Sequence, residues 1–247
     1  MTDPVVARLR AAGCVFAEDE AALLRSSGGD IEALLARRVA GEPLEYVLGW
    51  ASFCGLRVIV EPGVFVPRVR TEALALAARA FVRPGSVAVD LCCGSGAVGA
   101  VLASAGARVL AVDVDPAAVA CARRNVPTAL LGDLYDPLPS SLRGHVDVIT
   151  ANAPYVPTRA IALMPPEARE HEHRVALDGG ADGLDVQRRV IAVAPQWLAP
   201  DGVLLIETSA AQAPATSALF VAAGLTACGR RDDERDATFV LGSRIAP

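Results

Sequence analysis

Apolar residues in the first forty positions recur at the three- and four-residue spacing that is typical of amphipathic helices. This spacing is carried by Val5, Val6, Leu9, Ile31, Leu34 and Leu35. Gly13 and the cluster at 26–29 interrupt the pattern, as helix breaks do. The segment from Asp3 to Arg38 is therefore expected to fold into a few short helices, within an N-terminal unit of residues 1–50.

The pattern changes at about residue 51, where apolar and polar residues begin to alternate as they do in strands. The alternating apolar residues are Phe53, Leu56, Val58, Val60, Val64 and Val66. Glu61, Pro62 and Gly63 interrupt them with turn-forming residues. These features predict a β-hairpin linker over residues 51–70, with its turn at 61–63.

Strand-like and helix-like segments then alternate from residue 71 to 247. The predicted strands are Val87–Leu91, Ala107–Val112, Thr128–Leu131, Val146–Thr150, Gly202–Glu207, Leu225–Arg230 and Ala237–Leu241. The predicted helices are Thr71–Phe81, Ala97–Ala105, Pro116–Asn125, Leu184–Ala194 and Ala211–Ala223. Apolar strands that alternate with helices indicate a doubly wound α/β sheet. The last two strands have no room for a helix between them, so they should form an antiparallel hairpin.

Composition removes several classes of chemistry. The 247 residues include 23 arginines and no lysine, which excludes Schiff-base enzymes and P-loop nucleotidases because both need a lysine amine. The formal net charge is -5, so the chain lacks the basic field with which proteins capture nucleic acid. We therefore expect no direct binding of nucleic acid.

The six cysteines contain no CxxC pair and no histidine at zinc-ligand spacing, so we expect no metal site. Thiols without a disulfide framework are typical of a reducing compartment, and the cytoplasm is the expected location. Neither a signal peptide nor an apolar stretch of membrane-spanning length is present in the sequence. We expect no association with a membrane.

A glycine-rich turn follows the first strand of the α/β region. Gly94, Gly96 and Gly99 match the GxGxxG pattern, and Asp113 comes 19 residues after Gly94, at the end of the next strand. Such a turn brings the backbone close to a ligand, and the helix that follows favours an anionic group at its N-terminus. A nicotinamide dinucleotide is compatible with this pattern alone.

Three acids at successive strand ends favour a cationic nucleoside instead. Asp90 would repel a pyrophosphate but would attract the ammonium group of a methionine moiety. Asp133 follows the third strand and could accept a hydrogen bond from an adenine amino group. Together with Asp113, these acids favour S-adenosyl-L-methionine, although each could also be a loop acid or a helix cap.

The tetrapeptide Asn152-Ala153-Pro154-Tyr155 follows the fourth strand. The Asn152 side-chain oxygen and the Ala153 carbonyl could each accept one hydrogen of a planar NH2 group, and the Tyr155 ring could stack on its flat face. The lone pair of the nitrogen would then point at a methyl donor. The alternative interpretation is an Asx turn that closes a loop.

These motifs resemble the HemK/PrmC-type protein-(glutamine-N5) methyltransferases, which modify a glutamine of peptide-chain release factors and carry Asn-Pro-Pro-Tyr at this place. The resemblance runs from about Arg38 to the end. Its further matches are Gly41–Leu44, Gly49–Leu56, Pro67–Glu72, Ala176–Leu177, Gly179 and Gly183. The chain departs from the family pattern at Ala153, at Arg70 where the family has an acid, at Cys92 where it has glycine, and at Leu134.

The resemblance implies a class I S-adenosylmethionine-dependent methyltransferase, with a Rossmann-like, seven-stranded, mostly parallel sheet, preceded by a helical docking domain and a hairpin. Asn152 and Tyr155 would be catalytic, and the acceptor amide would contact Asn152, Ala153, Pro154 and Tyr155. Segment Pro67–Glu72 would border the pocket. The cofactor, which leaves as S-adenosyl-L-homocysteine, would be held by Asp90, Cys92, Cys93, Gly94, Ser95, Gly96, Asp113, Asp133, Leu134 and Asn152.

The expected function is therefore N5-methylation of a glutamine in a protein, most simply a release factor, by a monomeric enzyme. Two alternatives use the same residues. One is an amino methyltransferase that acts on adenine or guanine of a nucleic acid. The other is a nicotinamide-dependent reductase that uses the glycine turn of residues 94–99.

Overall fold

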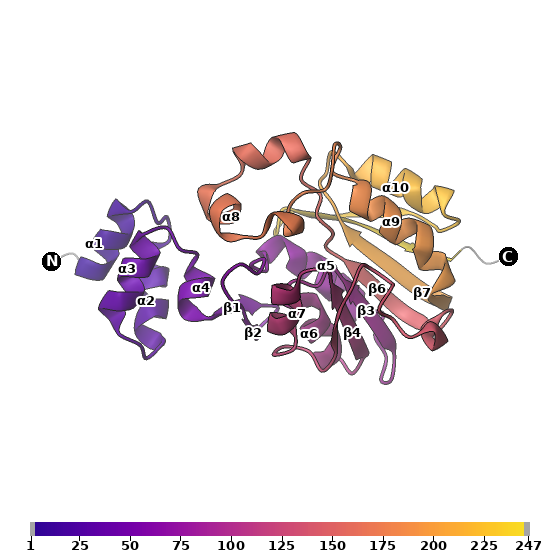
Figure 1. The fold of residues 1–247 in the computed structure, drawn as a ribbon, viewed down its shortest axis with the longest axis horizontal. Helices are drawn as coiled ribbons and strands as arrows, with labels where there is room; N and C mark the ends of the chain where they lie inside the picture. The colour runs from indigo at the N-terminus through magenta and orange to yellow at the C-terminus, as the bar shows by residue number, and fades with distance from the viewer. Residues whose placement is uncertain (1–2, 245–247) are drawn as a thin grey trace.

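The computed structural model describes residues 3–244, and its centre is a seven-stranded sheet (Figure 1). The strand order is β5-β4-β3-β6-β7-β9-β8, and the pairs β7–β9 and β8–β9 are antiparallel while the others are parallel. The strands are β3 (Val87–Leu91), β4 (Arg108–Asp113), β5 (Ala129–Leu131), β6 (Val146–Ala151), β7 (Leu198–Glu207), β8 (Cys228–Asp232) and β9 (Ala237–Ser243). This confirms the predicted sheet and its terminal hairpin.

Helices cover both faces of the sheet, because the strands are apolar on both sides (Figure 1). One face packs against α5 (Val69–Arg79), α6 (Ala97–Ser104) and α7 (Pro116–Ala122). The other face packs against α9 (Asp185–Val193) and α10 (Ala213–Ala222). Successive residues of one strand alternate between the two cores: Val203 and Leu205 face α5, whereas Leu204 and Ile206 face α9.

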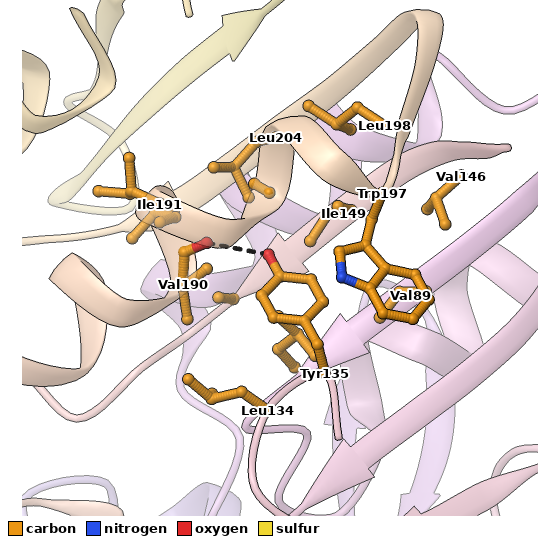
Figure 2. Packing of buried hydrophobic residues seen from close by; sticks show 14 of the residues in the cluster. Val89, Leu134, Tyr135, Val146, Ile149, Val190, Ile191, Trp197, Leu198 and Leu204 are labelled. Carbon is orange, nitrogen blue, oxygen red and sulfur yellow. Dashed lines mark hydrogen bonds between the residues drawn. The ribbon is translucent and has the colours of Figure 1, made fainter. Parts of the chain in front are cut away.

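Figure 2 shows how the loop that follows β5 packs into the core on the α9 side of the sheet. The Tyr135 ring stacks on Trp197 with 5.7 Å between the ring centroids, and its hydroxyl donates to the carbonyl of Val190 at 3.0 Å. Leu134, just before it, has a left-handed backbone with φ of 50°. The loop therefore sends Tyr135 into the core and keeps Leu134 and Asp133 at the carboxyl edge of the sheet.

Four helices with a small core of their own precede the sheet and lie at one end of the molecule (Figure 1). They are α1 (Pro4–Ala11), α2 (Ala17–Ser26), α3 (Ile31–Val39) and α4 (Leu44–Leu48). The side chains of Asp3 and Asp30 cap the first and third of these helices by accepting backbone N–H groups. Helix α4 was not predicted, because its five residues are too few to show a helical period.

The position predicted for the hairpin turn was wrong. The two strands are β1 (Trp50–Phe53) and β2 (Leu56–Ile59), and they are joined by Cys54 and Gly55, which have φ of 48° and 77°. Two consecutive residues with positive φ make the tight turn that matches the twist of a hairpin. Residues 61–63 instead lie beyond the hairpin, where buried Val64 and Val66 continue the alternation outside any strand.

Several boundaries also differ from the prediction. Helix α5 begins two residues earlier, β7 begins four residues earlier, and β8 is shifted toward the C-terminus by two to three residues. Between β6 and α9 lies an unpredicted segment with a short α-helix, α8 (Pro166–His171), between two 3-10 turns. No helix in residues 3–244 has the length and apolar character needed to cross a membrane.

Candidate active site

A cavity of about 880 Å³ opens at the carboxyl edge of the parallel strands. This is where ligands bind in open α/β sheets, and the volume lies within the usual range for such sites. Of the predicted site residues, those that line it are Asp90, Cys92, Cys93, Gly94, Ser95, Asp113, Asp133, Leu134, Asn152, Ala153, Pro154 and Tyr155. Gly96 lies behind this wall, where it begins α6 with φ of 79°.

Two of the predicted acids hold the glycine turn by accepting hydrogen bonds from backbone N–H groups. Asp113 accepts the backbone N–H of Gly94 at 2.8 Å, and Asp90 accepts that of Gly99 at 2.9 Å. The lack of a side chain at Gly99 leaves room for this contact, because an added Cβ would lie only 3.2 Å from the Asp90 carboxylate. Cys92 has a φ of 54°, which lies in the left-handed region that favours glycine. Cys92 is partly buried at the cavity wall, and burial raises the pKa of its thiol.

Asp90 is almost completely buried, and its second oxygen accepts the Thr150 hydroxyl at 2.9 Å. Burial raises the pKa of this carboxyl to about 7, against the hydrogen bonds from Thr150 and Gly99. No cationic side chain pairs with it among residues 3–244. A buried carboxylate without a counter-ion favours a ligand that brings a positive charge.

Asp133 differs from the other two acids because it is half-exposed and paired with a cation. Arg189 of α9 donates to its carboxylate at 2.6 Å. This pair holds the Asp133 side chain at the rim of the cavity, where the remaining lone pairs of the carboxylate can accept an amino group. Arg189 was not identified from the sequence, since nothing in the pattern of α9 indicates that it reaches the site.

Gly179, Gly183 and Gln212 pack closely against the backbone of the Asn152–Tyr155 loop. An added Cβ at Gly179 would lie 2.6 Å from the Pro154 carbonyl oxygen, and one at Gly183 would overlap the Tyr155 carbonyl. Gln212 also donates to the Tyr155 carbonyl at 3.0 Å. The two glycines therefore allow the close approach that holds this loop.

The polar groups of the loop are placed differently from one another. Asn152 donates its Nδ2 to the Thr71 hydroxyl at 3.2 Å, and the Tyr155 hydroxyl donates to Glu207 at 3.3 Å. The Ala153 carbonyl accepts no hydrogen bond from residues 3–244, which leaves it available to a ligand. Burial raises the pKa of Tyr155 to about 12, so the hydroxyl stays protonated and remains a donor.

Segment Pro67–Glu72 borders the cavity as the resemblance implied, except at Val69 and Glu72. Pro67, Arg68, Arg70 and Thr71 line the wall. Glu72 points away, where it accepts the backbone N–H of Cys54 at 2.7 Å and pairs with Arg235.

Glu207 was missed. It ends β7, is 2% exposed, and contacts Tyr155 from behind. The rule that identified Asp90, Asp113 and Asp133, an acid at the carboxyl end of a buried strand, also applies to it.

Comparison with known proteins identifies the family. Residues 88–171 match a family described as a methyltransferase domain. The chain is 37% identical over 220 residues to a release factor glutamine methyltransferase of Geobacter sulfurreducens, a match that covers 86% of this chain and 76% of that protein. This chain belongs to the release factor glutamine methyltransferase family. It is an S-adenosyl-L-methionine-dependent enzyme with the class I methyltransferase fold.

Two further relatives mark the breadth of this similarity. A methyltransferase of 4-amino-L-phenylalanine and 4-methylamino-L-phenylalanine from Streptomyces pristinaespiralis is 39% identical, over 76% of this chain and 68% of that protein. Fold similarity extends to a methyltransferase structure from Pyrococcus furiosus, which has a TM-score of 0.58 and 18% identity over 87% of this chain and 98% of that one.

The cavity fits the cofactor of this family on two observations. The unpaired, buried carboxyl of Asp90 is complementary to an ammonium group. Gly94 has no side chain to occupy the space between the turn and Phe65, where an added Cβ would be in van der Waals contact with the Phe65 Cβ at 3.8 Å. The glycine turn, Asp113 and Asp133 would then hold S-adenosyl-L-methionine along the carboxyl edge.

Proposed function

We propose that this chain methylates the side-chain amide nitrogen of a glutamine in a peptide-chain release factor. Membership of the family supports this function. The observation that carries it furthest is the placement of Asn152 and Tyr155 in the same cavity as the glycine turn. In this proposal, the residues that would bind the acceptor amide share one cavity with the turn that would hold the methyl donor.

Asn152 and Ala153 would hold the acceptor. The Asn152 Oδ1 and the Ala153 carbonyl each accept one N–H of the glutamine amide, and the Tyr155 ring covers its flat face. Both hydrogens are then fixed, so the nitrogen lone pair points toward the donor. Ala153 supplies the same carbonyl as the family's proline, without the fixed φ that proline would add.

S-adenosyl-L-methionine, when bound, supplies a methyl group on a positively charged sulfur. The chain holds the two reactants in line, and such positioning is worth about 7 to 11 kcal/mol of the barrier. No base is required before transfer, because the methylated amide can release its proton to water afterwards. The absence of lysine from the sequence also keeps one kind of repelling cation out of the cavity.

We also propose which residues contact each part of the cofactor. Asp90 binds the methionine ammonium, Asp113 the ribose, and Asp133 the adenine amino group. Cys92, Cys93, Gly94, Ser95, Gly96, Leu134 and Asn152 complete the wall. We further propose that the enzyme acts as a monomer in the cytoplasm, where release factors work, and that it does not bind nucleic acid directly.

A radiolabelled methyl donor tests the acceptor class. The purified chain is incubated with a release factor that bears a Gly-Gly-Gln tip, with ribosomal RNA, with DNA and with 4-amino-L-phenylalanine. The last acceptor is included because of the relative from Streptomyces pristinaespiralis. We expect label in the release factor, while label confined to a nucleic acid or to the amino acid would overturn the proposal.

A further inference from the structure

Glu207 and Asn152 are neighbours across the sheet, although 55 positions separate them in the sequence. Strands β6 and β7 are parallel, and Ala151 is in register with Ile206. The next residues along the chain are Asn152, which directly follows β6, and Glu207, which is the last residue of β7. Residues in register on adjacent strands point to the same face. This is the α5 face, because Leu205 belongs to the core that contains α5.

Thr71 of α5 lies between these two side chains. Its hydroxyl accepts from Asn152 Nδ2 at 3.2 Å, and it is 4% exposed. Glu207 Oε2 is buried without a hydrogen-bond donor among residues 3–244. The Thr71 hydroxyl is close enough to the Glu207 carboxyl to lower its pKa, as a hydrogen-bond donor does. The unpaired oxygen and this hydroxyl are therefore complementary.

We propose that Glu207 is a positioning residue that sets the orientation of the Asn152 amide through Thr71. An ionised carboxylate can only accept hydrogen bonds, so the Thr71 hydroxyl must donate to it. The lone pairs of Thr71 then accept Asn152 Nδ2, which turns Asn152 Oδ1 toward the acceptor. Glu207 also receives the Tyr155 hydroxyl at 3.3 Å, so one carboxylate orients both residues of the amide-binding pair.

The hydrogen bonds that run from Asn152 through Thr71 to Glu207 form a relay. The direction in which they donate depends on the charge of Glu207. Burial raises the pKa of this carboxyl, whereas Thr71, Arg70 and Tyr155 lower it. Arg70 and Thr71 belong to α5, and Tyr155 belongs to the loop after β6. Within residues 3–244, these are the side chains that change the pKa of Glu207. A protonated Glu207 could donate to Thr71, reverse the relay and turn the Asn152 NH2 toward the acceptor.

Kinetics test the proposal, which rests on the proposed function for its activity readout. Glu207→Gln can donate an N–H to Thr71, so we expect kcat to fall about a hundred-fold while cofactor affinity stays within about two-fold. Thr71→Val should reproduce this loss, and Thr71→Ser, which keeps the hydroxyl, should restore most of it. Unchanged kcat in both Glu207→Gln and Thr71→Val would overturn the proposal.

The dependence of kcat on pH distinguishes an orienting role of Glu207 from a purely structural one. In the wild type, kcat should fall as the pH drops through the raised pKa of Glu207. This acid limb should be absent in Glu207→Gln. Arg70→Gln removes a nearby positive charge and should move the limb to higher pH. A limb that stays in Glu207→Gln contradicts the assignment.

A spectroscopic measurement tests the relay without any acceptor. The chain contains two asparagines, Asn125 and Asn152, so side-chain 15N labelling of asparagine gives two NH2 groups, assigned with Asn152→Ala. We expect hydrogen exchange of the Asn152 group with water to accelerate in Glu207→Gln while that of Asn125 stays constant. Identical exchange in the wild type and Glu207→Gln would overturn the relay, whereas an inactive wild type with the expected exchange would count against the proposed function alone.

Discussion

Asp90 is a single carboxyl whose charge controls how well the site can receive a cation. Its burial and its two hydrogen-bond donors act in opposite directions on its pKa, and burial prevails, giving about 7. The ionised form is the one that attracts the cofactor's ammonium group. Binding of the cation should therefore favour loss of a proton from this group.

The first prediction is that cofactor affinity falls as the pH drops through 7. With a pKa of about 7 in the free protein, one linked proton makes binding about eight-fold weaker at pH 6 than at pH 7.5. Titration calorimetry with S-adenosyl-L-homocysteine at several pH values measures this. Asp90→Asn should bind more weakly at every pH and lose the dependence. A dependence that survives in Asp90→Asn would contradict the role of Asp90.

At the scale of elements, the site is built where several segments meet. Strands β3, β4 and β6 bring Asp90, Asp113 and the Asn152 loop to one edge, and α5 closes it from one face with Thr71. Two glycines allow the backbone of residues 154–155 to be held from behind. The geometry of the loop therefore depends on residues that do not touch a ligand.

The second prediction compares two glycines with similar backbones. Gly183 and Gly224 have φ of 80° and 77°, but an added Cβ at Gly183 would overlap the Tyr155 carbonyl, while nothing lies within 4 Å of one at Gly224. Both alanine substitutions should cost about 1 kcal/mol of stability from the left-handed backbone. Gly183→Ala should also lower kcat about a hundred-fold by displacing the loop. Equal kcat values for the two variants would refute this close-packing role.

The sequence was sufficient to predict elements whose pattern is local. The parallel strands, the glycine turn and the acids at strand ends could be identified because burial and turn chemistry leave a direct signature. The hairpin turn was missed because Cys54 is not a residue that usually signals positive φ. The strand-end rule could have marked Glu207 as a candidate, but its place beside Asn152 depends on which strand lies next to β6. Arg189 could not be placed without knowing which helix lies beside Asp133.

At the scale of the whole molecule, an ion-pair network joins the N-terminal helices to the segment beside the site. Arg38 of α3 is largely buried, and it pairs at 2.6 Å both with Glu20 of α2 and with Glu167 of α8. Helix α8 follows the Asn152–Tyr155 loop in the chain. The position of the N-terminal helices is thereby linked to the cavity.

The third prediction concerns this link. Glu167→Ala leaves the pair of Arg38 with Glu20 intact and removes its bond to α8, so KM for the protein substrate should rise. The rise should not exceed about five-fold, because Glu167 is the exposed partner of this pair and solvent limits such ion pairs to about 1 kcal/mol. Glu18→Ala, which removes an exposed pair within the N-terminal helices, is the control. Steady-state kinetics that give the two variants the same KM would contradict the link.

The central claim is that Asn152 binds the acceptor glutamine in the same cavity that binds the cofactor. Peptide mass spectrometry of a release factor after incubation with the enzyme tests it most directly, alongside calorimetry with S-adenosyl-L-homocysteine. The account predicts one added methyl group on the glutamine with the wild type, none with Asn152→Ala, and nearly equal cofactor affinity for both. Methylation at the wild-type rate by Asn152→Ala would contradict the account.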